Sequence, residues 1–206
     1  MRKGIALFCT VFVLVSSGYA QSNRVGVYAT PQGNVLGKIT KDWVLDLSRK
    51  EKGLMLGEGI YYERCGNLSG LTIGLGFTQV RNTYTSDLRI GEGTNQMNFI
   101  SLLLSGNTNF HDGDKFKVGM QYGFQFHYLL KWSQDGLEWD FSDREGYERL
   151  ALTINVGASF TYLFTDNIGI SVTLPSVSLL GRSTHDEPYI YWGFGGQIRL
   201  FYAFGY

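Results

Sequence analysis

The fold is indicated most directly by the last eighteen residues of the chain, 189-YIYWGFGGQIRLFYAFGY-206. Successive side chains of a β-strand point to opposite faces, so the stretch can be read as two rows of alternate residues. The even-numbered row, from Ile190 to Tyr206, is apolar and aromatic apart from one glycine. The odd-numbered row holds most of the glycine together with Gln197 and Arg199. The stretch therefore predicts one unusually long strand with an oily face and a small, polar face.

A second stretch, residues 116–131, shows the same alternation. Every even-numbered residue from Phe116 to Leu130 is apolar, and Leu129 is the only apolar residue of the odd-numbered row. Such a row is long enough to cross the hydrocarbon of a bilayer on a tilted strand, and the polar residues behind it belong in a hydrated or hydrogen-bonded interior. The pattern predicts a membrane-spanning strand. A soluble lipocalin-like barrel, the alternative, would point the apolar row inward.

Further alternating segments complete a set of eight predicted strands. Five of them lie between turn-forming residues, at 53–64, 71–80, 96–105, 150–164 and 168–180. The connections alternate between short ones (66–70, 109–114, 165–167) and longer ones (81–95, 131–149, 181–188). Barrels of outer membranes have short periplasmic turns and longer outer loops. The sequence therefore predicts an all-β, eight-stranded antiparallel up-and-down transmembrane β-barrel, with the N- and C-termini periplasmic.

The first strand has the least clear pattern. Residues 30–34, Thr-Pro-Gln-Gly-Asn, have the composition of a turn. We therefore expect the first membrane strand within 35–49, with 21–34 as a possible periplasmic lead-in. The alternative places this strand at 24–30 and makes 31–52 a long outer loop.

The orientation of the predicted strand at 53–64 is ambiguous as well. Glu58 occupies the same face as three aliphatic residues, Leu54, Leu56 and Ile60. A β-bulge, or a lumen face that is partly apolar, would explain this mixture. If Glu58 points into the lumen, it could pair with Lys117 or Arg199.

The N-terminus has the parts of a secretory signal peptide. A charged start and an apolar run at 5–15 lead to Ala20, so we expect 1–20 to be cleaved and 21–206 to form a single transmembrane barrel domain. Cleavage leaves sixteen of the eighteen basic residues against eighteen acidic ones, a balance that argues against a nucleic-acid partner. Cys65 is then the only cysteine, which excludes an internal disulfide.

The end of the chain resembles the insertion signal of outer-membrane barrels, in which a terminal aromatic residue follows apolar residues at alternate positions. The matching residues are Ile198, Leu200, Tyr202, Phe204 and Tyr206. The mature chain is similar to the small bacterial outer-membrane β-barrel domain family, the porin-family or PorT-like group that includes OmpA-type and OmpX-type barrels. The resemblance implies a bacterial outer-membrane location, the barrel-insertion machinery and outer-membrane lipids and lipopolysaccharide as partners, and a structural, adhesive or accessory envelope role. It identifies no extracellular ligand.

The alternation also predicts a polar network inside the barrel. Its expected members are Lys117, Gln121, Gln125, His127, Lys131, Thr153, Asn155, Gln197 and Arg199. Because the interior of an eight-stranded barrel is about filled by its own side chains, we expect this network to plug the lumen. A narrow solute channel is the alternative.

A rival function is modification of lipid A by a deacylase or acyltransferase at the outer rim. Its candidates are four neighbours in the last outer loop, Ser183, His185, Asp186 and Glu187. The acidic segment 135–148, with Trp132, Trp139 and Tyr147, suggests a cation or glycan site, but its spacing fits no EF-hand loop. Residues 111–114, His-Asp-Gly-Asp, are ordinary turn chemistry. We therefore predict a non-enzymatic protein with no catalytic residue, no metal site and no cofactor.

Overall fold

The computed structural model describes residues 20–39, 45–46, 52–66, 69–85, 92–138, 147–184 and 188–205. Among these residues, eight strands are 15 to 21 residues long. They are β1 (Ala20–Ile39), β3 (Lys52–Gly66), β4 (Ser69–Thr85), β5 (Glu92–Asp112), β6 (Phe116–Gln134), β8 (Tyr147–Leu163), β9 (Ile168–Thr184) and β10 (Pro188–Phe204). Two short strands, β2 (Leu45–Asp46) and β7 (Leu137–Glu138), pair with β1 and β6.

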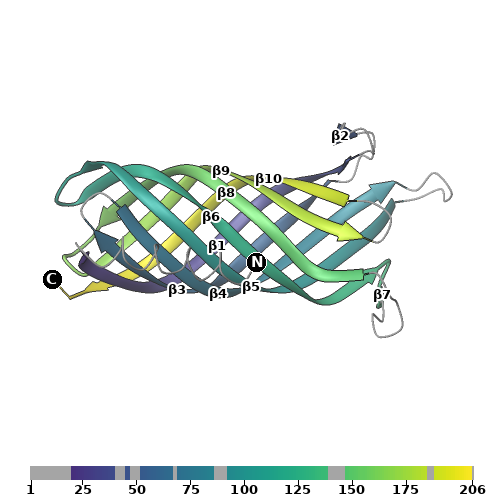
Figure 1. Ribbon diagram of the computed structural model, residues 1–206, viewed down its shortest axis with the longest axis horizontal. Coiled ribbons are helices and arrows are strands. Elements are labelled where there is room, and N and C mark those ends of the chain that lie inside the picture. Colours follow the sequence, from purple (N-terminus) through teal and green to yellow (C-terminus); the bar gives the residue numbers. More distant parts are fainter. Residues whose placement is uncertain are drawn as a thin grey trace, which may run out of the picture.

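The long strands close into a barrel (Figure 1). Each pairs antiparallel with the next long strand along the chain, and β1 pairs with β10. This confirms the predicted eight-stranded up-and-down barrel. In the part of the chain that the structure describes, no helix is long and apolar enough to span a membrane. We call the end of the barrel where β3, β5 and β8 finish the turn end, and the opposite end the loop end; β1 begins and β10 finishes at the turn end.

The first strand lies earlier in the chain than expected. The prediction of a strand within 35–49, with 21–34 as a lead-in, is wrong, because β1 begins at Ala20 and pairs with both β3 and β10. The alternative at 24–30 identified the correct segment but ended it too early. Tertiary pairing on both sides of β1 overrides the turn preference of its residues.

Proline is accommodated in β1 and β9 where the ladder is interrupted. Pro31 points outward, and the pairing of β1 with β10 skips Thr30 and Pro31. The register of β9 with β10 shifts between Gly195 and Gln197, opposite the position of Pro175. Since proline has no N–H to donate to a ladder, both residues occupy positions where a missing donor is tolerated.

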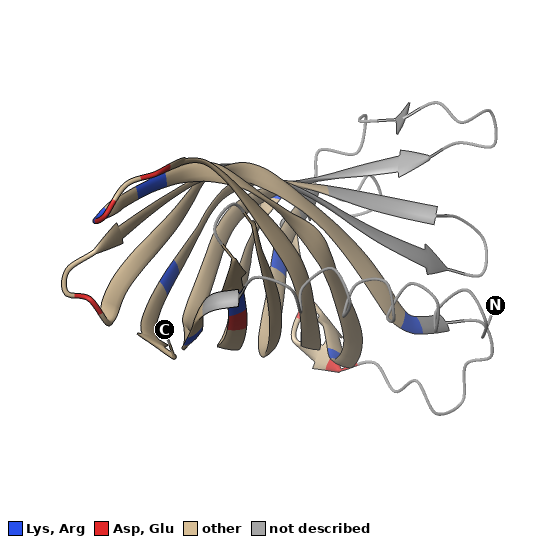
Figure 2. Cartoon of the chain, turned by 60° about the vertical axis from the view of Figure 1, so that its left-hand side comes forward, with Lys and Arg blue, Asp and Glu red and all other residues tan. Residues whose placement is uncertain are grey.

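The apolar rows face outward, as a membrane barrel requires. Phe124 and Leu200, near the centres of their rows, are 44% and 49% exposed. Trp192 near the loop end and Tyr162 and Tyr202 near the turn end are exposed too, in the positions that interfacial aromatic residues occupy in membrane proteins. Charged residues are sparse along the length of the barrel (Figure 2). A lipocalin-like fold would have buried these rows, so the soluble alternative is excluded.

Glu58 points outward, which overturns the suggested pairing with Lys117 or Arg199. It shares the exposed face of β3 with Leu54, Leu56 and Ile60, while Met55 and Tyr61 point inward. The pairing of β3 with β4 has no register shift. The partly apolar lumen, and not a bulge, therefore explains the ambiguous alternation of this strand.

The interior contains two apolar clusters with polar groups between and beside them. The cluster nearer the loop end consists of Met55, Val80, Met97, Phe99, Leu129 and Ala151, with Trp132 packed against it. The cluster nearer the turn end consists of Tyr28, Tyr61, Leu103, Phe201 and Ala203, with Leu163 packed against it. The core of this protein is thus the filled lumen of the barrel.

Candidate functional site

The polar interior lies at the middle of the barrel, on the inward faces of β4, β5, β6, β8, β9 and β10. Six of the residues expected there are buried and lie on inward faces: Gln121, Gln125, His127, Thr153, Gln197 and Arg199. Strand alternation explains this directly, because these residues occupy the rows opposite the exposed apolar ones.

Arg199 is the centre of the largest hydrogen-bond group. Its Nε donates to Gln197 Oε1 at 2.8 Å, and its two Nη atoms donate to Thr72 Oγ1 at 3.2 Å and Ser105 Oγ at 3.1 Å. The guanidinium also lies over the ring of Tyr61, 5.0 Å from the centroid. One side chain from β10 therefore reaches across the lumen to β3, β4 and β5, and no carboxylate of the described residues is in hydrogen-bond contact with its charged group.

Gln121 extends this group across the barrel. Its Nε2 donates to Gln197 Oε1 at 2.6 Å, and its Oε1 accepts a hydrogen bond from Thr173 Oγ1 at 2.7 Å. Both ends of the amide are used, so the side chain is fixed between β9 and β10. A solute crossing the lumen at this level would have to break these contacts.

His127 forms a second group closer to the loop end. Ser101 Oγ lies 2.9 Å from Thr78 Oγ1 and 2.7 Å from His127 Nδ1, and His127 Nε2 lies 2.7 Å from Thr153 Oγ1. Both ring nitrogens are therefore within hydrogen-bond distance of a hydroxyl group. The side chains of Ser101 and His127 are each only 1% exposed, so this contact is enclosed in the interior and we assign it a packing role.

A buried ion pair near the turn end was not predicted. Arg24 Nη1 lies 3.2 Å from Glu63 Oε2, and Asn107 donates to the other oxygen of Glu63. The Arg24 guanidinium lies over the ring of Phe201, 4.5 Å from the centroid. Cys65 is buried beside this pair with a free thiol. Arg24 was not predicted as a lumen residue because the first strand was expected within 35–49. The alternation within 24–30 could have identified it, since Arg24 lies on the same face as the inward-facing Tyr28.

Two of the expected lumen residues lie elsewhere. Lys131 is exposed and forms an ion pair with Glu138 on β7. The strand register explains its position: Asn98 of β5 lies opposite Lys131, but the next residue, Phe99, lies opposite Leu129. The extra residue of β6 at this bulge shifts the alternation, so Lys131 turns outward. Lys117 is half-buried at the turn end, where its Nζ lies 2.5 Å from Asp112 Oδ1, and it takes no part in the central network. Asn155 lies in the inward row of β8 and is half-buried.

The rim candidates show local structural roles or lie outside the described residues. Residues 111–114 cover the end of β5 and the start of the turn to β6, in which Gly113 N donates to Phe116 O at 3.1 Å. Asp135 has a φ of 53°, precedes Gly136 in the turn to β7, and accepts a hydrogen bond from Thr94 N. Residues 139–146 and 185–187 lie outside the described part of the chain, as do the side chain of Ser183 and the terminal Tyr206. The other four residues of the insertion signal, Ile198 to Phe204, are exposed on the outer face.

No protein-family model and no curated protein matches the sequence. Among solved structures, the outer membrane protein OprG from Pseudomonas aeruginosa matches over 93% of this chain and 99% of that one, with 11% sequence identity and a TM-score of 0.50. The Neisserial surface protein A, NspA, matches over 89% of this chain and 99% of that one, at 8% identity and a TM-score of 0.49. Ail, the attachment invasion locus protein of Yersinia pestis, matches over 90% and 99%, at 15% identity and 0.40.

The chain has the fold of a small bacterial outer-membrane β-barrel. The resemblance inferred from the sequence is thereby confirmed at the level of the fold, and the outward apolar rows give the barrel a surface for hydrocarbon. The expected outer-membrane location agrees with both findings. The interior of this barrel is filled, and polar groups from all eight long strands form hydrogen bonds there.

Proposed function

We propose that this outer-membrane barrel has a closed interior and serves as an anchor in the envelope, with a structural, adhesive or accessory role. The observation that carries the proposal is the hydrogen-bond network around Arg199. It links β10 to β4 and β5 and, through Gln121, to β6 and β9, so that side chains fill the cross-section at mid-height. A barrel that conducts solutes needs the opposite arrangement, a lumen in which polar groups are left free for water.

A second obstruction supports the same function. Toward the loop end, Phe99, Met97 and Leu129 are each 1% exposed or less and lie within the lumen. Ions crossing this section would be dehydrated without receiving replacement ligands. The polar network and the apolar cluster thus close the lumen in series, and we assign activity to the exposed ends of the barrel and not to its interior.

Planar-bilayer recording tests the closed lumen. The purified, refolded protein is expected to give no discrete conductance steps in 1 M KCl. The double variant Phe99→Ala with Arg199→Ala removes one large side chain from each of the two obstructions and is expected to give measurable current. It is the positive control for membrane insertion and for detection of the current. Regular steps from the wild-type protein would refute the closed interior and favour a channel.

The anchor role is tested in cells. We expect the protein to be found in a purified outer-membrane fraction and to migrate differently on gels before and after heating. A lipid A deacylation assay on the same membranes addresses the rival enzyme, with His185→Ala as the matched variant. Activity that is present in the wild type and lost in His185→Ala would replace the anchor role with an enzymatic one.

A further inference from the structure

Glu58 places a carboxylate on the lipid-facing wall, far from either end of the barrel. It is the seventh of the fifteen residues of β3, and its side chain is exposed. Its cross-strand neighbours are Ala29 on β1 and Phe77 on β4. Among the described residues, the other exposed charged side chains lie near strand ends or in turns, as Lys52 and Lys131 do. Ionisable groups at this depth are costly in hydrocarbon and usually mark a functional contact.

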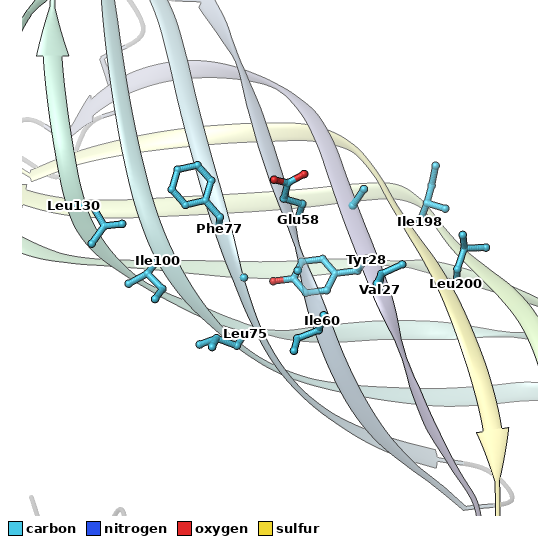
Figure 3. A pocket seen from close by; sticks show the side chains of 13 residues that line it. Val27, Tyr28, Glu58, Ile60, Leu75, Phe77, Ile100, Leu130, Ile198 and Leu200 are labelled. Carbon is cyan, nitrogen blue, oxygen red and sulfur yellow. The ribbon is translucent and has the colours of Figure 1, made fainter.

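The carboxylate lies at a groove in the outer wall (Figure 3). The groove has a volume of about 710 Å³, and its sides are formed by aliphatic and aromatic residues of β1, β3, β4, β5, β6 and β10, including Ile60, Phe77 and Ile198. In the close view, Glu58 lies between Phe77 and Ile198. The lining residues other than Glu58 are apolar or glycine, apart from the phenol of Tyr28.

The floor of the groove is a thin part of the wall. It contains Ala29, Gly59 and Gly76, and Tyr28 lies directly behind it on the lumen side. A Cβ at Gly76 would lie 2.4 Å from Tyr28 Oη, and a Cβ at Gly59 would lie 2.9 Å from Tyr28 Cε1. Both glycines belong to the inward rows of their strands, so their missing side chains make room for the tyrosine ring in the lumen. On the outer side, the small side chain of Ala29 keeps the surface low beside Glu58. A membrane segment can approach the backbone of β1 closely at this position.

Glu58 makes no hydrogen bond or ion pair with any residue in the described part of the chain. The hydrocarbon core is about 30 Å thick, so lipid headgroups lie about 15 Å from its centre and cannot reach a carboxylate at mid-strand. A second copy of this chain offers no cation at this depth among the described residues, because its exposed Lys and Arg side chains lie near the strand ends. The remaining source of a positive charge for Glu58 is a Lys or Arg side chain on a membrane-spanning segment of another protein.

We propose that the Glu58 groove is a docking site for a membrane-spanning segment of another protein that presents a lysine or arginine at mid-membrane depth. The charge pair removes the cost of an unpaired carboxylate in hydrocarbon, and the groove accepts the apolar part of the segment. The role extends beyond the anchor function, since it assigns the barrel a partner that binds from the side.

The test uses the refolded barrel in phosphatidylcholine vesicles, with a donor dye on the barrel and an acceptor dye on a synthetic peptide. The peptide is a polyleucine transmembrane helix with one central lysine, and its matched control has norleucine at that position. We expect energy transfer with the lysine peptide only. Glu58→Gln, which removes the charge, and Ala29→Leu, which fills the groove floor, are each expected to weaken association by about tenfold or more. Gel migration before and after heating verifies that each variant is folded.

Relocating the carboxylate separates the charge from the groove. Val156 is exposed at the middle of β8, on the opposite wall. Adding Val156→Glu to Glu58→Gln is expected to leave association weak. Equal association of the lysine peptide with wild type and Glu58→Gln overturns the proposal, and so does full recovery in the relocated variant. Glu58-dependent energy transfer between copies of the barrel itself would also overturn it, because the occupant would then be a second copy.

Discussion

Neutralising Glu63 should destabilise the barrel by several kcal/mol although it removes no volume. Arg24 and Glu63 are 3.2 Å apart, and their side chains are only 8% and 3% exposed. In Glu63→Gln, the Arg24 guanidinium stays in the lumen without its counter-charge, while the introduced amide keeps the size of the side chain and the contact with Asn107. Breaking a buried pair from one side costs about 3–5 kcal/mol. We expect a loss near the lower value, about 3 kcal/mol, because Arg24 keeps its contact with the Phe201 ring.

The second half of this prediction concerns Arg24→Met. Alone it leaves Glu63 as an unpaired buried carboxylate and should cost a similar amount. Combined with Glu63→Gln, it removes both charges, and the double variant should be within about 1–2 kcal/mol of wild type. The effects of the two changes on the free energy of unfolding are then far from additive. A double-mutant cycle measures this difference as the coupling energy between Arg24 and Glu63.

Urea unfolding in detergent micelles, followed by tryptophan fluorescence, gives the free energy of unfolding of all four proteins. Lys131→Met is the control, because its ion pair with Glu138 is about half exposed and should contribute less than about 1 kcal/mol. The reasoning is refuted if Glu63→Gln costs less than about 1 kcal/mol, or if the double variant loses the sum of the two single losses.

Three further perturbations test the outer face, the seam and the interior. Phe124→Arg puts a cation in the middle of the lipid-facing row of β6 and should lower the free energy of unfolding in vesicles by about 2–4 kcal/mol. An unchanged free energy of unfolding would show that this row does not contact hydrocarbon. Gly26→Val should strongly reduce the folded fraction on unheated gels, because even a Cβ at this position would lie 2.0 Å from Leu200 O in the β1–β10 seam. His127→Ala should cost about 3 kcal/mol by removing two 2.7 Å hydrogen bonds and leaving a cavity, and a fully stable variant would contradict the packing role given to this group.

The alternation of side chains was sufficient to predict most of the barrel. In β6 and β10 the period of two assigns each residue to a face without reference to any other strand, which is why Phe124 lies outside and Gln125 inside. Alternation fails to predict the extent of a strand where pairing with neighbouring strands, and not the local sequence, determines it. Pro31 and its neighbours have the composition of a turn, yet they continue β1 because strands on both sides pair with it.

Single residues inserted into the ladder were beyond prediction from one sequence. Lys131 was expected inside because it continues the odd-numbered row of β6, but the bulge opposite Asn98 reverses the alternation just before it. Glu58 was ambiguous because the lumen near it is lined by Met55 and Tyr61, so both faces of β3 contain apolar residues. The Arg24–Glu63 pair depends on the register between β1 and β3, which joins residues 39 positions apart.

The pairing of β1 with β10 joins the first and the last of the long strands that the structure describes. Until β10 is complete, β1 and β9 each present a free edge, and unpaired backbone groups are not tolerated in hydrocarbon. Assembly therefore cannot proceed strand by strand into the bilayer from the N-terminus alone. The barrel closes only when β10 is paired on both sides, so a defect in this strand affects the closure of the whole barrel and not only its final segment.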